Sequence, residues 1–483
     1  MNQEFNIDPD ADTRMNARLA SARRERLEAA RRERQESDAA LGTTPAPRHR
    51  KPPTRLSPDR LKLARFYRPP GFDPHRLGFA SDEVYGVYFF LHLIRWKRIQ
   101  WQADADGFSR LKWDYLERIL GRALLPRLRL KLVQKEIIDW DLSTARGTKC
   151  QGFRIRSPYR EQKWELITCT DDRLNRRIQA ASADGAVAPL GVHDWLTAKF
   201  ETLVFDLPRA LAIIPTLPID PDVALARGIG AAGEYHKILA DQCQAIADRF
   251  HETSVCRYGR FHSPLTRLHR ALRPTLSVGG RPLVELDIAN SQPLFLGLVA
   301  REYYRSGMAR KRLLERTFDH PADVYRYGRL TEANCRPCSS SGVEAYIRLC
   351  ERGEFYESLM RDGDDRARFK TDLFREVFFG RNTAKEPRPV RARFVARHPT
   401  VAAVLKALKR KDYRLSAWVL QNAEATLIID VICGRLMRER PDLTVFTIHD
   451  SFLVLPDDTK YVKTVVEDEF RKRGVEVRVR EKA

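Results

Sequence analysis

Two aspartates stand inside short apolar stretches that are expected to form β-strands. Asp287 lies in the run Leu283–Ile288, which follows a Gly-Gly-Arg-Pro turn, and Asp450 lies in the alternating run Leu443–Leu455. Side chains alternate across a strand, so Glu285 and Asp287 share one face of the first. A carboxylate in apolar surroundings costs free energy unless a cation, a polar partner or water compensates it. Two such strands in one sheet would bring two carboxylates together, and paired carboxylates holding Mg²⁺ ions are what in-line phosphoryl or nucleotidyl transfer uses.

At these residues the sequence resembles a known family. The run Leu286–Gln292 resembles motif A, and Ile448–Phe452 resembles motif C, of the family A polymerase palm. That family contains the DNA polymerase I-type enzymes and the bacteriophage-type single-subunit RNA polymerases, and the resemblance covers roughly the last half of the chain. It implies an α+β right-hand fold, with an antiparallel palm sheet and helical fingers and thumb. It also implies that Asp287 and Asp450 hold two Mg²⁺ ions, for which Mn²⁺ can substitute, with the backbone carbonyl of Ile288 as an extra ligand.

A stretch between the two motifs has the composition of a nucleotide-binding helix. Four of its side chains recur every fourth residue and so share one helical face: Arg366, Lys370, Phe374 and Phe378. Cations at one end and aromatic rings at the other suit the phosphates and the base of a nucleoside triphosphate. The alternative is an ordinary amphipathic helix, with both rings in a core and both cations in solvent. Because of its position the stretch resembles motif B, the fingers helix, although Phe379 stands where the family has glycine, and Gly380 follows.

The resemblance assigns primer and template contacts to four further residues: Arg260, Gln421, His449 and Ser451. Arg260 follows a glycine ahead of motif A, as the family's minor-groove arginine does. Gln421 lies in an apolar helical stretch before motif C, and the other two residues flank Asp450. Glu285 is either a third acid at the metal site or a surface partner of an arginine, and we favour the second interpretation.

Single positions bear on the choice between deoxyribonucleotides and ribonucleotides. Five residues after Asp287, the family's DNA enzymes carry a glutamate that excludes the ribose 2′-hydroxyl, whereas the RNA enzymes carry glycine; here the residue is the bulky Gln292. Phe378 also lacks a phenolic hydroxyl with which to favour a ribose. Ser291 and Ser451, in contrast, resemble the RNA enzymes. We weigh the steric effect most, and expect a DNA polymerase that acts on a DNA template–primer with deoxynucleoside triphosphates.

Two other functions stay open. One is a single-subunit RNA polymerase or primase on the same palm, with RNA as a partner, and the other is a non-catalytic, DNA-binding replication initiator. The net charge of +22 and the pI near 9.8 favour a polyanionic partner such as nucleic acid in every case. With no segment suited to a proofreading exonuclease, the expected role is replication of a plasmid, phage or mobile element.

Composition limits the compartment and the remaining sites. We find no apolar run of about 18 residues, so no membrane-spanning helix is expected. Eight cysteines in 483 residues are too few for a disulfide scaffold and indicate a reducing cytoplasm. The pair Cys335 and Cys338 is either half of a zinc site or, as we favour, an unliganded loop.

Four regions are expected along the chain. Residues 1–58 form a disordered basic arm and proline-rich linker, either holding nucleic acid or simply solvated, and residues 61–165 form a winged helix-turn-helix. Residues 166–255 form a connector and a helical thumb, assigned by family order alone, and residues 256–483 form palm and fingers. In the winged helix, 124–133 is the expected recognition helix, with these cations facing a duplex: Arg122, Arg127, Arg129 and Lys131, and Arg146 and Lys149 on the wing.

Overall fold

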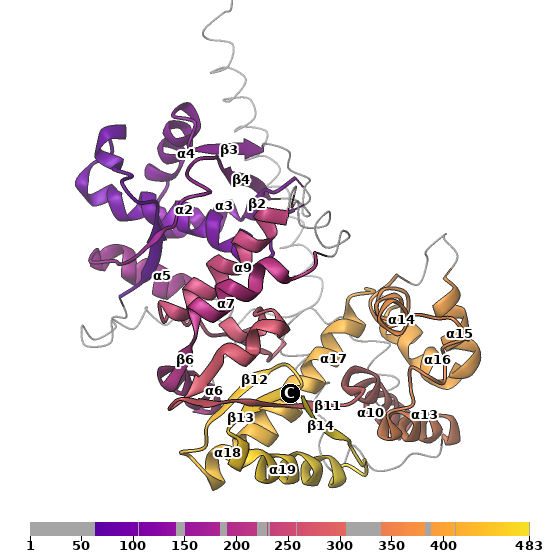
Figure 1. Cartoon of the computed structure of the whole chain (residues 1–483). Helices are drawn as coiled ribbons and strands as arrows, with labels where there is room; N and C mark the ends of the chain where they lie inside the picture. The colour runs from indigo at the N-terminus through magenta and orange to yellow at the C-terminus, as the bar shows by residue number, and fades with distance from the viewer. Residues whose placement is uncertain are drawn as a thin grey trace, which may run out of the picture. The chain divides into compact units, whose positions relative to one another are not determined.

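The structure is a computed structural model that describes residues 63–104, 106–141, 150–183, 191–219, 229, 232–256, 258–305, 340–381, 388–410 and 412–482. The chain divides into two compact units, 1–61 and 62–483, and the fold below is that of the second. The expected basic arm, the wing residues Arg146 and Lys149, and the pair Cys335 and Cys338 lie outside the described residues. The described part combines many helices with small antiparallel sheets, so it is mixed α and β as expected (Figure 1).

The first part contains the helices and the hairpin expected from the sequence, with one added strand. Its elements, in order, are α2 (Val84–Ile99), β2 (Ser109–Leu111), α3 (Trp113–Leu120), α4 (Leu124–Gln134), β3 (Ile138–Asp141) and β4 (Gln151–Ile155). Helix α3 begins only at Trp113, because Ser109–Leu111 pairs with β4 in a sheet of order β2-β4-β3. Apolar residues of all three helices meet in one core, as their spacing predicts.

The part of the chain that connects the first part to the aspartate sheet begins after a two-stranded sheet. Strands β1 (Arg65–Arg68) and β5 (Glu165–Thr168) pair, and α5 (Asp172–Ala183) follows them. Then come α6 (Gly191–Ala198), β6 (Leu203–Phe205), α7 (Leu207–Ile213), α9 (Ala232–Ala247), β7 (Ser254–Val255), β8 (Phe261–His262), β9 (Leu276–Val278) and β10 (Arg281–Pro282). Strands β7 and β8 pair, and β10, β9 and β6 form a three-stranded sheet.

Helix α9 lies in the stretch that family order alone assigned to a helical thumb. It contacts both α2 and α7, and its residues contribute to two hydrophobic cores. The Gln242 side-chain amide donates a hydrogen bond of 2.6 Å to the Ile99 carbonyl at the end of α2. Because α9 is packed on these sides, it is a core helix that joins the first part of the fold to the rest.

A four-stranded antiparallel sheet carries both aspartates. Its order is β12 (Val445–Ile448), β13 (Ser451–Val454), β11 (Val284–Ile288) and β14 (Val479–Lys482). Strands β12 and β13 are buried along their whole length, which explains their nearly continuous apolar sequence. Helices α18 (Gly434–Glu439) and α19 (Thr459–Arg471) lie beneath the sheet in Figure 1, and α19 contacts β11 and β14.

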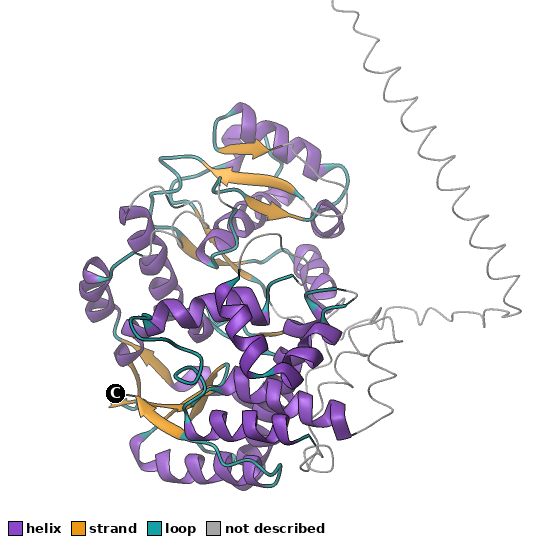
Figure 2. Ribbon diagram, turned by 90° about the vertical axis from the view of Figure 1, so that its right-hand side faces the viewer, coloured by secondary structure: helices purple, strands orange, loops and turns teal. Residues whose placement is uncertain are grey.

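The remaining helices pack beside this sheet. They are α10 (Ser291–Arg305), α13 (Ser341–Arg352), α14 (Arg366–Leu373), α15 (Pro389–Arg397), α16 (Pro399–Leu408) and α17 (Leu415–Ala425). Two π-helical segments, Phe374–Phe378 and Thr426–Cys433, continue α14 and α17, and Figure 2 shows how much of this region is helical. Among the described residues, the helix Leu415–Glu439 alone is long and apolar enough to cross a membrane, but 72% of its most apolar window is buried inside the protein. It is therefore a core helix here.

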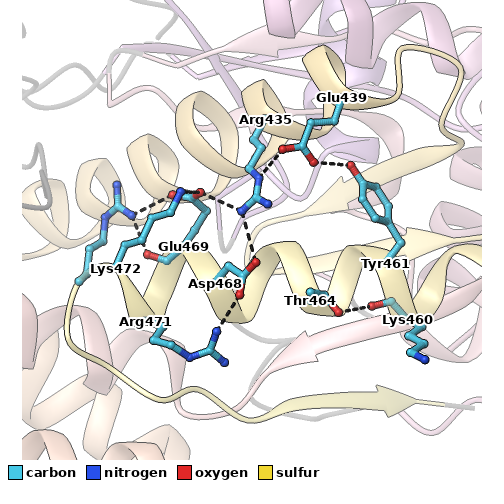
Figure 3. A network of polar contacts seen from close by, with 10 residues as sticks. Arg435, Glu439, Lys460, Tyr461, Thr464, Asp468, Glu469, Arg471 and Lys472 are labelled. Carbon is cyan, nitrogen blue, oxygen red and sulfur yellow. Dashed lines mark hydrogen bonds and ion pairs between the residues drawn. The ribbon is translucent and has the colours of Figure 1, made fainter.

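A network of ion pairs joins α18 to α19 (Figure 3). The Arg435 guanidinium of α18 donates to Glu439 of the same helix at 2.7 Å and to Glu469 of α19 at 3.2 Å. The second of these bonds ties the two helices together. Glu469 also accepts from Lys472 at 2.7 Å and from Arg473 at 3.1 Å. We refer to these residues as the α18–α19 network; each of its acids is matched by a cation.

Candidate active site

The fold brings Asp287 and Asp450 to the same end of the four-stranded sheet. Asp287 on β11 pairs in register with Ser451, the first residue of β13. Asp450 immediately precedes Ser451, in the two-residue turn between β12 and β13, rather than inside a strand as its apolar flanks suggested. The Ser451 hydroxyl donates a hydrogen bond of 2.8 Å to Asp287, and the Ser291 hydroxyl, at the start of α10, donates one to Asp450. Both aspartates are therefore oriented by neighbouring serines.

Two strained backbone positions flank these aspartates. His449, in the β12–β13 turn, and Asn290, just before α10, both have φ of +55°, which is uncommon for residues other than glycine. Such a conformation costs about 1–3 kcal/mol and persists only where the surrounding structure enforces it. His449 directly precedes Asp450, and Asn290 directly precedes Ser291, the serine that binds Asp450. The backbone strain therefore lies at the site.

The charges at the site are only partly compensated. Burial raises the pKa of Asp450, and the nearby Asp287 charge raises it further, against the hydrogen bond from Ser291. Asp287 has a cation beside it, because the Lys482 ammonium of β14 lies 2.9 Å from its carboxylate. Because Asp287 and Asp450 are close and burial disfavours the charged form of Asp450, a further cation would stabilise the ionised pair.

Glu285 has the arginine partner that we favoured, but it is not on the surface. Arg273 binds its carboxylate at 2.6 Å, and Lys482 lies 3.5 Å from it. The Glu285 residue is only 8% exposed. Glu285 and Asp287 thus share Lys482 across one face of β11, and the Arg273 pair explains how an acid is tolerated in the middle of this strand.

Glu424 on α17 is a third acid of the site, which the sequence interpretation missed. It is 2% exposed, and burial raises its pKa to about 7, with the Asp450 charge adding to the effect. Arg260 forms an ion pair of 2.7 Å with this carboxylate and opposes the shift without overcoming it. An acid within an otherwise apolar helical stretch is the same signal that singled out the two aspartates, so the sequence did contain a clue.

Arg260 and Gln292 both bind Glu424. The Arg260 side chain is largely buried in its ion pair, which differs from the exposed duplex contact that the resemblance implied. The Gln292 side-chain amide donates a hydrogen bond to the same carboxylate, which fixes Gln292 next to Ser291 and its Asp450 partner. Ile288 ends β11 with a buried side chain, and Gln421 is half-buried on α17, one turn before Glu424.

His449 faces a second histidine. Its ring centroid lies 6.3 Å from that of His262, in an edge-to-face arrangement. Burial, together with neighbouring charges that include Arg260, lowers the pKa of each ring to about 4. Both imidazoles are therefore neutral near pH 7, and His449 can act there as a polar neutral group rather than as a cation.

The residues of the expected fingers helix divide into two groups. Arg366 and Lys370 are exposed, and their cationic groups lie 5.3 and 5.8 Å from the centre of the Tyr356 ring. Burial raises the pKa of the Tyr356 phenol, and the charge of Asp450 is one of the smaller contributions to that shift. Arg366 also binds Glu357 at 2.9 Å.

Phe374 and Phe378 stack on each other with centroids 5.1 Å apart, but they are not equivalent. Phe374 is half-buried, whereas Phe378 is fully buried in the core and has no surface left for a nucleotide. The expectation that Phe378 contacts a nucleotide is thus wrong, and Phe378 is a core residue, as in the alternative interpretation of this helix. The buried Lys409 ammonium ends this helix, since it donates to the Gly380 carbonyl at 2.9 Å and to the Val377 carbonyl.

The cations of the expected recognition helix have partners within the protein. Arg127 is paired with Glu83, and Lys131 donates to the Gly78 carbonyl at 2.6 Å. The Arg129 guanidinium lies 3.8 Å from the centre of the Trp140 ring, and Arg122 lies 3.4 Å from Glu117 while staying largely exposed. Arg122 is therefore the most accessible of the four, and three of them also hold α4 in place.

No protein-family model matches the chain, and a search of curated proteins finds no match. Within the part of the chain that the structure describes, no group of three or more His, Cys, Asp or Glu residues is placed to hold a metal. The candidate site is thus a pair of aspartates, with Glu424 behind Gln292.

Proposed function

We propose that the protein is a template-directed nucleotidyltransferase, and specifically a DNA polymerase with a palm similar to that of family A. The observation that carries the proposal is the meeting of Asp287 and Asp450, from opposite ends of the second half of the chain, at one end of an antiparallel sheet. Each is hydrogen-bonded to a serine, and strained residues flank them. A site that stores both strain and charge repulsion is a candidate for catalysis rather than for stability.

The donor set fits Mg²⁺. This ion takes oxygen ligands and is usually held by one or two carboxylates together with the phosphates of its substrate, so two aspartates suffice. Asp287 and Asp450 would hold it, and their mutual repulsion is what its charge would relieve. When bound, such ions activate a hydroxyl nucleophile and stabilise the charge on the transferred phosphate. Lys482 competes for Asp287, so its ammonium has to give way as a cation binds.

The exposed cations of α14 are our candidates for binding phosphates. Arg366 and Lys370 project from α14, and both cationic groups lie near the Tyr356 ring. Positioned positive charge of this kind stabilises the developing charge of a triphosphate. Phe374, with its half-buried ring, is the aromatic surface available to a base, supported from behind by Phe378.

Gln292 supports a preference for deoxyribonucleotides. Its amide is held by Glu424, which is held in turn by Arg260, so the side chain has a fixed place beside the aspartates. A fixed bulky group excludes an added hydroxyl more effectively than a mobile one, because it cannot move aside at low cost. Arg260 and Glu424 then act as positioning residues, which is a different role from the duplex contact first expected for Arg260.

The first part of the fold supports a nucleic-acid partner. Its order of helix, strand, two helices and two strands supports the winged helix-turn-helix that we propose, and Arg122, just before α4, extends into solvent. Together with the chain's net charge of +22, this favours binding to a duplex.

Primer extension tests the proposal. A DNA template–primer is incubated with Mg²⁺ and either deoxyribonucleoside or ribonucleoside triphosphates, with Asp450→Asn beside the wild type. We expect extension with deoxyribonucleotides by the wild type and none by the variant. Absence of nucleotide addition by the wild type with either set overturns the proposal, and duplex binding without addition then indicates the non-catalytic initiator.

A second candidate has its own observation. Ser451 and Ser291, the residues that resemble the RNA enzymes, are the ones that hydrogen-bond the two aspartates. A single-subunit RNA polymerase or primase on the same palm accounts for this choice. Primer-free synthesis from ribonucleotides in the same assay identifies it.

A further inference from the structure

A cavity of about 470 Å³ lies away from the aspartates, between α2, the β2–β4 strands and α9. These elements lie beside one another in Figure 1. Part of its wall is apolar and is formed by isoleucines of α2, β4 and α9: Ile94, Ile99, Ile155 and Ile238. Pockets that bind small molecules have volumes of about 300–1,000 Å³ and combine an apolar wall with a few convergent polar groups. The volume and the wall thus suit a small ligand.

Cations outnumber acids around this cavity. Five basic side chains line it: Arg95, Arg98, Arg154, Arg160 and Lys237. The acids that line it are Glu161, Glu234 and Asp241. One of these cations, Arg154, pairs with Asp139 outside the lining at 2.9 Å, so the lining and its direct partners carry an excess of one positive charge, which favours an anionic ligand.

Arg95 is the buried cation of this cavity. The residue is 8% exposed, and one of its terminal nitrogens lies 2.9 Å from Asp241. The other terminal nitrogen, Nη1, is buried without a hydrogen-bond partner among the described residues. The guanidinium carbon lies over the rings of Tyr67 and Trp164, 4.9 and 5.3 Å from their centres. A buried donor without an acceptor costs free energy, and an anionic oxygen would recover it once the guanidinium turns Nη1 towards the cavity.

Two further cations form only loose ion pairs. Arg160 lies 3.8 Å from Glu234, and Lys237 lies 3.6 Å from Asp241, both beyond hydrogen-bond distance. Each acid has a closer partner, since Glu234 binds Arg98 and Asp241 binds Arg95. Arg160 and Lys237 can therefore turn to a ligand without leaving a buried acid unpaired.

We propose that this cavity binds a phosphate monoester, with the phosphate on Arg95, Arg160 and Lys237 and the ester's organic body against the isoleucine wall. A phosphate monoester carries close to two negative charges at neutral pH and offers three acceptor oxygens, one for each of these three cations. A free nucleotide and the 5′-phosphate of a nucleic-acid strand share this chemistry. The proposal uses none of the residues of the candidate active site.

Calorimetric titration of the full chain in EDTA tests the proposal, because removing divalent ions removes the metal-dependent binding expected at the aspartates. The probes are deoxyadenosine monophosphate, deoxyadenosine and inorganic phosphate, followed by a short oligonucleotide with a 5′-phosphate or a 5′-hydroxyl. We expect the monophosphate to bind at least about tenfold more tightly than the nucleoside, because it gains charged hydrogen bonds. A preference of the oligonucleotide for the 5′-phosphate identifies a strand end as the source, and the lack of one identifies a free nucleotide.

Two variants locate the binding. Arg160→Gln and Lys237→Gln each remove one cation that is about one-third exposed, and each is expected to weaken monophosphate binding about tenfold. Arg176→Gln on α5 is the matched control, since Arg176 is exposed and does not line the cavity. Equal affinity for nucleoside and monophosphate, or undiminished binding by both cavity variants, overturns the proposal. Primer extension by the wild type is unaffected by either outcome, so this failure is distinct from failure of the polymerase proposal.

Discussion

Two clusters of acids in the same half of the chain are built in opposite ways. In the α18–α19 network, Glu469 accepts hydrogen bonds from Lys472, Arg473 and Arg435 (Figure 3). Burial alone would raise the pKa of Glu469, but these cations outweigh it and the pKa is lowered. At the candidate site, burial raises the pKa of Asp450 and Glu424, and the neighbouring cations do not reverse it.

The difference separates a structural cluster from a candidate functional one. An acid that the fold fully compensates stabilises the folded state and has no capacity left for a ligand. An acid held with its charge partly uncompensated lowers stability, and the fold retains it only if something else, such as a bound cation, uses that charge. Substitutions in the two clusters are therefore expected to have opposite effects on activity and on stability.

The largest expected effect is on activity at the aspartate pair. Asp450→Asn keeps the size of the side chain and removes the charge, so nucleotide addition is expected to fall at least about a thousandfold, the equivalent of several kcal/mol of metal-assisted stabilisation. Single-turnover primer extension measures this rate. The matched control beside the other cluster is Asp468→Asn on α19, an acid 2.7 Å from Arg471 and 3.6 Å from Arg435. It is expected to leave the rate within about twofold, and an equal loss in both variants contradicts the comparison.

The second effect is on stability in the α18–α19 network. Glu469→Gln removes a buried acid from three cations, including its 3.1 Å ion pair with Arg473, which is itself only 4% exposed. Loss of one member of a buried pair costs about 3 kcal/mol, so the free energy of unfolding is expected to fall by about that amount. Urea denaturation provides the measurement. Asp450→Asn should unfold at the same or higher urea concentration than the wild type, and a lower midpoint for it would show that its charge stabilises the fold.

The third effect is a pH dependence at Glu424. Its pKa is about 7 in the folded protein against an ordinary value of 4.5, so the folded state holds a proton that the unfolded chain has released. The stability that this proton provides is present at low pH and is lost as pH rises from about 4.5 to 7. Relative to Glu424→Gln, the wild type should lose on the order of 3 kcal/mol between pH 4.5 and pH 8.

Urea denaturation of both proteins at several pH values measures this difference. The groups shared by the two proteins titrate equally and cancel, so the difference reports on Glu424 alone. A constant difference between pH 4.5 and pH 8 would show that Arg260 fully compensates Glu424, which would place it with the structural acids.

The smallest expected effect is on the choice of sugar. Gln292→Gly removes the side chain that Glu424 holds beside the aspartates, and ribonucleotide use relative to deoxyribonucleotide use should rise about tenfold, as for a steric difference of about 1.4 kcal/mol. Parallel primer extension with each nucleotide set gives the ratio. If ribonucleotide use does not increase, Gln292 does not select the sugar. Gln421→Gly, on α17 one turn from Glu424, is the matched control and should leave the ratio unchanged.

Elements with strong apolar periodicity could be predicted from the sequence. The expected helix 124–133 corresponds to α4, and the expected strands around Asp287 and Asp450 correspond to β11 and to the β12–β13 hairpin. Local pattern sufficed there because each element buries a clear run or stripe of apolar residues. Strand β2 was missed because three residues carry too little pattern, and its pairing with β4 is a contact across about 40 positions of sequence.

Residue roles were less predictable than elements. The every-fourth-residue pattern placed Phe374 and Phe378 on one face, but it could not show that the second ring is completely buried and the first is not. Arg260 and Gln292 were singled out separately, whereas their common partner Glu424 lies more than 130 positions beyond either. Lys482 became part of the site because β14 pairs with β11.

The sequence by itself determined that two acids stand in apolar segments, that the chain is strongly basic, and that helices and strands follow one another in this order, because these properties depend on residue types and local spacing. Tertiary structure alone decided which end of the sheet unites Asp287 with Asp450, which serines hold them, and which acids remain uncompensated. The physical reason is that a carboxylate's pKa depends on its burial and on charges within a few ångströms, and most of those neighbours come from distant parts of the chain.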